Sequence, residues 1–106
     1  MINYSFIIPH KNTPELLQKC LDSIPRRGDV QIIVVDDNSD ADKVEFSNFP
    51  GLDDSSVEVY LTKEGEGAGY ARNVGLGHAI GKWIVFADAD DFFNPSIGSA
   101  LDEFVD

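Results

Sequence analysis

Apolar residues gather in four short runs along the chain, and segments with helical spacing separate them. Three runs, at residues 4–8, 32–35 and 83–87, are largely continuous, which is typical of buried strands. The first of them closes at Pro9. The fourth run, at residues 57–61, alternates between apolar and polar positions and predicts a strand with one face in water.

Three segments between and after these runs have the pattern of helices. Thr13 offers a hydroxyl cap before Pro14 and Glu15, which is a typical helix start. Asn94-Pro95 repeats the cap and proline, while residues 67–80 place small side chains on one helical face, where a helix could lie close to a sheet. Residues 40–56 show no readable pattern. The apolar face expected of the first helix consists of Leu17, Cys20, Leu21 and Ile24.

Strands that alternate with helices predict an α/β fold. The connections imply parallel pairing and right-handed crossovers, so we expect an open, mostly parallel sheet flanked by helices. At 106 residues with 42% apolar content, the chain is expected to form a single domain over residues 1–106.

Polar clusters follow three of the predicted strands directly. In an open α/β sheet, ligands bind beyond the carboxyl ends of the strands, so the three clusters are expected to converge on one edge. The clusters are His10-Lys11-Asn12, Asp36-Asp37-Asn38 and Asp88-Ala89-Asp90-Asp91.

The last cluster indicates a metal site. Side chains alternate along a strand, so Asp88 and Asp90 point the same way, and two such carboxylates repel each other unless a cation lies between them. The alternative is that one acid caps the next helix while the others are solvated. A cap needs one acid and not three, which favours the metal, and oxygen ligands favour Mg²⁺ or Mn²⁺ over zinc.

Charge and composition exclude several classes of partner. The net charge of −11 would repel nucleic acid backbones and anionic membranes, so neither is expected as a direct partner. The sequence contains no transmembrane run. The lone Cys20 is expected to be a packed core thiol in a reducing compartment. His10 and His78 fit no catalytic arrangement and are expected at the surface.

The ordered set of motifs resembles the family 2 glycosyltransferases of GT-A fold, over nearly the whole chain. Asp-x-Asp alone is a weak signal, but the four motifs in this order are specific. They are Ser5-Phe6-Ile7-Ile8-Pro9, Val34-Val35-Asp36-Asp37-Asn38-Ser39, Ala71-Arg72-Asn73-Val74-Gly75-Leu76, and Gly81-Lys82-Trp83-Ile84-Val85-Phe86-Ala87-Asp88-Ala89-Asp90-Asp91.

The resemblance implies a Rossmann-like GT-A fold and a nucleoside-diphosphate sugar as donor. It further implies Mn²⁺ or Mg²⁺ as cofactor, and transfer of the sugar with inversion to a glycan or lipid-linked acceptor. Family members of this kind assemble polysaccharides or envelope glycans at the cytoplasmic side of a membrane, which gives the expected location.

Roles for individual residues also follow from the resemblance. Asp90 would be the metal ligand, and Asp88 would contact the metal, the ribose or the donor sugar. Asp37 would accept a hydrogen bond from the imino N–H of the nucleobase. The base would lie beside the loop that Pro9 opens. Arg72 would lie near the diphosphate, or would instead form a salt bridge that anchors an Asp of the cluster. The expected substrate-binding residues are Pro9, Lys11, Asn12, Asp37, Arg72, Asp88 and Ala89.

Two positions depart from the family pattern. Lys11 stands where many members have an aromatic residue that stacks on the base, so we expect it to reach a phosphate instead. Thr13 stands where some members carry an acid.

Adjacent residues of an extended segment point to opposite faces, so Asp36 should face solvent or cap the following segment through Asn38 and Ser39.

Family catalytic domains continue well past the Asp-x-Asp motif, into a half that binds the acceptor and carries the general base. The base is therefore expected beyond Asp106, and this chain is expected to be the donor-binding part. By itself it should transfer no sugar. An apolar sheet edge or helix face should also be left uncovered, which favours self-association or low stability. The alternative is a non-catalytic module that binds a nucleotide or metal. An aspartyl phosphotransfer domain is disfavoured, because no lysine-bearing strand follows Ala87.

Overall fold

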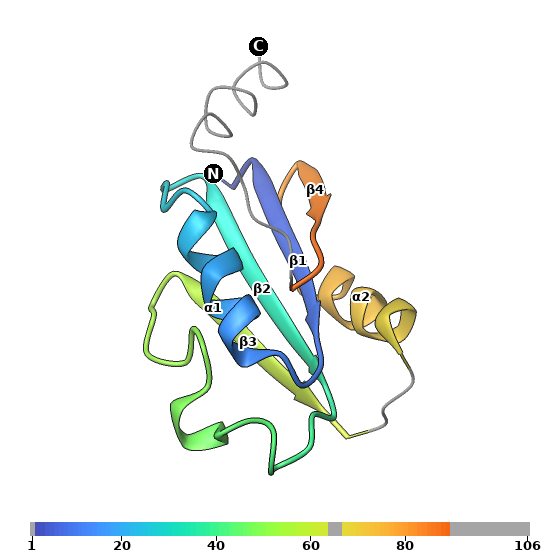
Figure 1. Cartoon of the computed structure of the whole chain (residues 1–106). Helices are drawn as coiled ribbons and strands as arrows, with labels where there is room; N and C mark the ends of the chain where they lie inside the picture. Colours follow the sequence, from blue (N-terminus) through green and yellow to red (C-terminus); the bar gives the residue numbers. More distant parts are fainter. Residues whose placement is uncertain (1, 64–66, 90–106) are drawn as a thin grey trace.

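A computed structural model describes residues 2–63 and 67–89 of the chain (Figure 1). Four strands form one sheet in the order β3-β2-β1-β4, and every neighbouring pair is parallel. The predicted open parallel α/β fold is therefore confirmed. The elements in chain order are β1 (Tyr4–His10), α1 (Pro14–Ser23), β2 (Val30–Asp37), the short 3-10 helix η1 (Phe46–Asn48), β3 (Val57–Thr62), α2 (Ala68–Leu76) and β4 (Trp83–Phe86).

The two central strands are buried at every residue because a helix covers each face of the sheet. Phe6 and Ile8 pack on the face of α1 with Leu17, whereas Ile7 packs on the opposite face with Ala71 of α2. Successive side chains of a strand point to opposite faces, so one continuous apolar run supplies both cores. Cys20 is a buried thiol of the α1 core, as predicted.

Small residues on α2 allow the close approach to the sheet that the sequence predicts. Ala71 and Gly75 are the buried residues of this helix. A β-carbon added to Gly75 would lie only 2.5 Å from Cγ2 of Ile7, so no larger residue fits without movement. The helix is shorter than the predicted segment and ends at Leu76.

Strand β1 runs past its expected end at residue 8 and includes Pro9 and His10. Ile7 O accepts a hydrogen bond from Ala87 N, so Ile7 and Pro9, two positions apart, both direct their backbone groups toward the side of β4. Strand β4 ends at Phe86, opposite Ile7. The next bond of this ladder would need an N–H at Pro9, so the pairing with β4 stops here, while β1 continues because it pairs with β2 up to His10.

The prediction that residues 83–87 form a buried strand is wrong in its burial. Strand β4 lies at an edge of the sheet, and its side chains are largely exposed, with Trp83 at 43% and Phe86 at 50%. An apolar run shows that a strand forms, but the order of strands in the sheet decides whether both faces and both edges are covered. The helix predicted from Asn94-Pro95 lies outside the described residues.

The segment without a readable pattern, residues 40–56, completes the α1 core. Val44 and Phe49 are buried there, and η1 is its regular element. No helix in the described ranges is both long and apolar enough to cross a membrane.

Candidate functional site

A pocket of about 240 Å³ opens where β1, β2 and β4 end and α2 begins. We call it the strand-end pocket. Each of the three polar clusters contributes at least one residue to it, which confirms that the clusters converge on one edge of the sheet. The lining residues are Pro9, His10, Lys11, Asp37, Gly67, Ala68 and Asp88.

Asp37 lines this pocket, and its two carboxylate oxygens differ in their hydrogen bonding. Its Oδ2 accepts a hydrogen bond of 2.8 Å from the backbone N–H of Gly67. Its Oδ1 is buried and has no hydrogen-bond partner in the described part of the chain. A buried polar atom without a partner costs free energy, so an N–H or O–H donor that bonded Oδ1 would recover that cost.

Gly67 precedes α2 and brings the helix start to Asp37. Its φ of +95° lies in the left-handed region, where a side chain would be strained. The bond between Gly67 and Asp37 joins the start of α2 to the end of β2 beside the pocket. Residues 64–66 lie outside the described ranges.

Asp36 points away from the pocket, which confirms the predicted opposition between the two adjacent acids. Its Oδ2 accepts from the N–H of Ser39 at 3.0 Å, and its Oδ1 accepts from the Ser39 hydroxyl at 2.6 Å. It therefore caps the following segment through Ser39, as one of the two predictions required, while its side chain is 1% exposed and does not face solvent. Burial alone would raise the pKa of Asp36, but hydrogen bonds from His10 and Ser39 outweigh burial and hold that pKa below its usual value.

His10 is not a surface residue, and that prediction is wrong. Its side chain is 0% exposed, its Nδ1 lies 2.7 Å from Asp36 Oδ1, and its Nε2 accepts from the N–H of Thr13 at 3.0 Å. The reason is the extension of β1. His10 lies two positions after Ile8, so its side chain points to the same face of the sheet, which α1 covers. His78 does lie at the surface, where its ring stacks on Tyr60 with centroids 3.8 Å apart.

The predicted hydroxyl cap of α1 does not form. Thr13 precedes α1, but its hydroxyl makes no capping hydrogen bond. The N–H of Thr13 donates to His10 Nε2, which is a separate bond just before the helix. The sequence carried one usable signal for this arrangement, namely a His directly after a strand whose parallel neighbour ends in Asp. That pairing becomes visible only once the register places His10 opposite Asp36.

Arg72 and Asp88 form an ion pair beside the pocket. Arg72 Nη2 lies 3.3 Å from Asp88 Oδ1, and the two side chains are 39% and 63% exposed. The structure thus contains the salt bridge that was one of the two predictions for Arg72. The predicted contact of Arg72 with a diphosphate stays a prediction. The ion pair does not prevent it, because an exposed pair of this kind can rearrange at low cost.

Other predicted site residues are distributed unequally. Lys11 is exposed and lines the pocket, whereas Ala89 is buried after β4. Asn12 does not line the pocket. Its side chain donates to Asp40 Oδ2 and accepts from Asp40 N, which ties the loop after β1 to the loop after β2.

The predicted metal site is only half described. Asp88 lies in the strand-end pocket, while Asp90 and Asp91 lie outside the described residues. Within residues 2–63 and 67–89, no three His, Cys, Asp or Glu side chains come together in a way that could hold a metal ion. The carboxylate of Asp88 is accessible and offers the oxygen donors that Mg²⁺ and Mn²⁺ prefer, so the described half fits such an ion.

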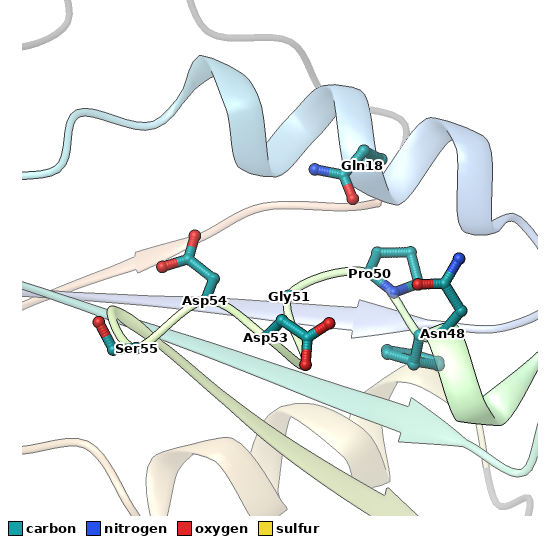
Figure 2. Close-up of a pocket in the computed structure, with 8 residues that line it drawn as sticks. Gln18, Asn48, Pro50, Gly51, Asp53, Asp54 and Ser55 are labelled. Atoms are coloured by element: carbon teal, nitrogen blue, oxygen red, sulfur yellow. The ribbon is translucent and has the colours of Figure 1, made fainter.

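A larger hollow of about 550 Å³ lies between α1 and the loop before β3 (Figure 2). Gln18 of α1 lines it from one side, and Pro50 and Asp54 line it from the loop. No described residue of the three strand-end clusters lines this hollow, and Asp54 is already hydrogen-bonded to Ser56. The larger volume of this hollow therefore does not indicate a functional site, and the strand-end pocket is the candidate site.

Comparisons with known proteins agree with the fold and with the resemblance of the motifs. The model of the family described as Glycosyl transferase family 2 matches residues 5–106. Glycosyltransferase GlyA of Streptococcus pneumoniae serotype 4 is 36% identical over 89 residues, which are 81% of this chain and 12% of GlyA. A PGL/p-HBAD biosynthesis glycosyltransferase of Mycobacterium bovis is 35% identical over 92 residues, which are 83% of this chain and 35% of that relative.

A solved structure shares the fold. S. aureus TarS 1-349 in complex with UDP-GlcNAc matches with a TM-score of 0.81 and 24% identity, over 98% of this chain and 31% of that one. The chain thus spans about a third or less of the relatives and the structure that it matches.

Proposed function

The chain belongs to glycosyl transferase family 2, and from that membership we propose that its strand-end pocket binds the nucleoside diphosphate of a sugar donor. The proposal rests above all on Asp37 Oδ1, a buried acceptor without a partner in the described residues, at the edge where open α/β sheets bind ligands. S. aureus TarS 1-349, which contains the same fold, was solved in complex with UDP-GlcNAc, and this supports a nucleotide sugar as the class of ligand.

The two sides of the pocket suit the two ends of a nucleotide. Asp37 can accept the imino N–H of a base, and a carboxylate acceptor discriminates against bases that offer only a lone pair there. Lys11 and Arg72 bring cationic groups to the rim, where they can contact a diphosphate. We therefore place the base against Asp37 and the diphosphate toward Lys11 and Arg72.

A divalent cation completes this proposal. Asp88 and Asp90 would hold Mg²⁺ or Mn²⁺, and the cation would offset negative charge on the leaving diphosphate. Without a cation, the acidic chain and the diphosphate would repel each other, which supports a metal as mediator. Arg72 would hold Asp88 in place through their ion pair until the ligand binds.

The reaction we propose is transfer of the sugar with inversion. An acceptor hydroxyl attacks the anomeric carbon from the face opposite the diphosphate, the bond from that carbon to the diphosphate oxygen breaks, and the hydroxyl proton passes to a base. Asp37 and Asp88 line the pocket on the nucleotide side, so we assign neither of them as that base. A glycan or lipid-linked hydroxyl at the cytoplasmic side of a membrane is the proposed acceptor, by analogy with the family.

Nucleotide titration of Asp37→Asn tests the base pocket. The Gly67 N–H requires an oxygen, so the single amide oxygen of the substituted side chain would be used there and its NH₂ group would face the ligand donor. Loss of a hydrogen bond to a charged group should weaken UDP binding by about 1.5–3 kcal/mol, or roughly 10- to 150-fold. Isothermal calorimetry with UDP and Mg²⁺ measures this loss.

One matched control and one comparison accompany this titration. Asp53→Asn removes the same charge at an exposed position in the larger hollow and should leave UDP affinity unchanged. Asp36→Asn should weaken binding less than Asp37→Asn, because Asp36 does not line the pocket. If Asp37→Asn bound UDP as tightly as the parent chain, the base would not lie against Asp37 and the proposal would fail.

A further inference from the structure

His10 has both ring nitrogens committed to partners. Its Nε2 lies 3.0 Å from the backbone nitrogen of Thr13, and a backbone N–H can only donate, so Nε2 must carry a lone pair. Its Nδ1 lies 2.7 Å from Asp36 Oδ1, which as a carboxylate oxygen can only accept. These partners assign the neutral tautomer with the proton on Nδ1.

The ring has no access to water that could replace these partners. The side chain of His10 is 0% exposed and that of Asp36 is 1% exposed. The imidazole packs edge-on against Phe49, with ring centroids 5.4 Å apart and an interplanar angle of 87°. A ring flip or a change of tautomer would leave a buried donor or acceptor unpaired.

The hydrogen bonds continue from Asp36 into the loop after β1. Asp36 accepts from the Ser39 hydroxyl, and the Ser39 oxygen accepts in turn from the backbone N–H of Asn12 at 2.8 Å. The N–H groups of Asn12 and Thr13 are therefore both held by side chains that bond to Asp36.

Both loops joined by this network contain a strained backbone position. Asn12 has a φ of +61° and Asn38 a φ of +60°, in the left-handed region that costs free energy for a residue with a side chain. Such conformations persist where surrounding contacts hold them. The network around Asp36 supplies those contacts to Asn12 directly and to Asn38 through its neighbour Ser39.

Residues of this network flank, in the sequence, two residues of the strand-end pocket. Lys11 lies between His10 and Asn12, and Asp37 lies between Asp36 and Asn38. We propose that His10, as its neutral Nδ1–H tautomer, is a positioning residue that joins the loop after β1 to the loop after β2 and so holds Lys11 and Asp37 at the pocket. His10 lines the pocket, but its side chain is 0% exposed, so its ring acts on a ligand only through these neighbours.

Two substitutions separate the two hydrogen bonds of the ring. His10→Asn places an amide near the position of Nδ1, which keeps a donor for Asp36 and loses the acceptor for Thr13. His10→Phe keeps a ring against Phe49 and loses both bonds. Ile24→Val, in the same core at the other end of α1, serves as a control for lost packing without any change at the pocket.

The first measurements need no ligand. Imidazole ¹⁵N resonances of the parent chain should show Nδ1 protonated and Nε2 unprotonated at neutral pH, and the opposite tautomer would overturn the proposal. Amide hydrogen exchange at Gly67 reports on Asp37, because Asp37 Oδ2 accepts that N–H. His10→Phe should accelerate exchange at Gly67 and Asn12, whereas His10→Asn should do so less and Ile24→Val should leave both rates unchanged.

The last measurement rests on the proposed function. UDP with Mg²⁺ should bind His10→Phe about 2- to 10-fold more weakly than the parent, the equivalent of one neutral hydrogen bond, with partial rescue in His10→Asn. If the parent does not bind UDP, the proposed function fails, and exchange at Gly67 still decides the role of His10. Unchanged exchange at Gly67 in His10→Phe, or UDP affinity equal to that of a binding parent, would reduce His10 to a packing residue.

Discussion

Gly75→Ala measures how closely α2 must approach the sheet in order to hold its first turn at the strand-end pocket. Gly75 is buried, and a β-carbon added there would lie 2.5 Å from Ile7 Cγ2. Carbon atoms pack at about 3.5–4.0 Å, so α2 or Ile7 would have to shift by about 1 Å. Ile7 is fully buried in the core with Ile33 and Val35, so it has little room to move. Overpacking of this kind costs about 1–3 kcal/mol.

Gly69→Ala in the same helix is the matched control. No atom lies within 4 Å of the position that its β-carbon would occupy. Alanine is favoured over glycine in a helix by about 0.5–1 kcal/mol, so Gly69→Ala should be neutral or stabilising. Gly75→Ala gains the same helix propensity but bears the overlap, so we expect a net loss of about 1–2 kcal/mol. The two substitutions should therefore change stability in opposite directions.

Urea unfolding followed by circular dichroism gives the free energy of unfolding of the parent chain and both variants by linear extrapolation. Comparison of the slopes checks that the denatured states expose similar surface. A Gly75→Ala chain as stable as the parent would show that α2 does not lie against Ile7 as closely as described. The reasoning that small residues bring the start of α2 to Asp37 would then be refuted.

Three further predictions concern acid stability, the metal and the exposed edge. The pKa of Asp36 is lower in the folded chain than its usual value, so its contribution to stability is complete above about pH 4 and is lost as pH falls through the lowered pKa. Urea midpoints between about pH 5 and pH 2 should therefore fall less in Asp36→Asn than in the parent. Asp90→Ala should weaken Mg²⁺-dependent UDP binding by about 1–3 kcal/mol in calorimetry, and equal binding would remove Asp90 from the metal site. Phe86 is 50% exposed on the edge strand, so Phe86→Ser should reduce self-association in sedimentation velocity, and a parent chain that stays monomeric would contradict this.

Local patterns in the sequence were sufficient for the order of elements and for the edge at which the site forms. The β-branched run at residues 32–35 predicted a buried strand because side chains of that shape suit a sheet covered on both faces, and β2 is buried throughout. The small face of α2 predicted its close approach, since residue size and helical spacing are both local properties. Parallel strands carry their carboxyl ends to one edge, so the clusters that follow them had to meet.

Register and strand order, in contrast, were decided by the tertiary structure. His10 became a buried partner of Asp36 because β1 and β2 pair in register up to these two residues, 26 positions apart in the sequence. The exposure of β4 followed from its place at the edge of the sheet, which its own apolar run does not encode. The bond from Gly67 to Asp37 likewise joins residues 30 positions apart. Periodicity reports which face of an element is apolar, whereas the partner that covers a face or bonds a polar group is set by long-range packing.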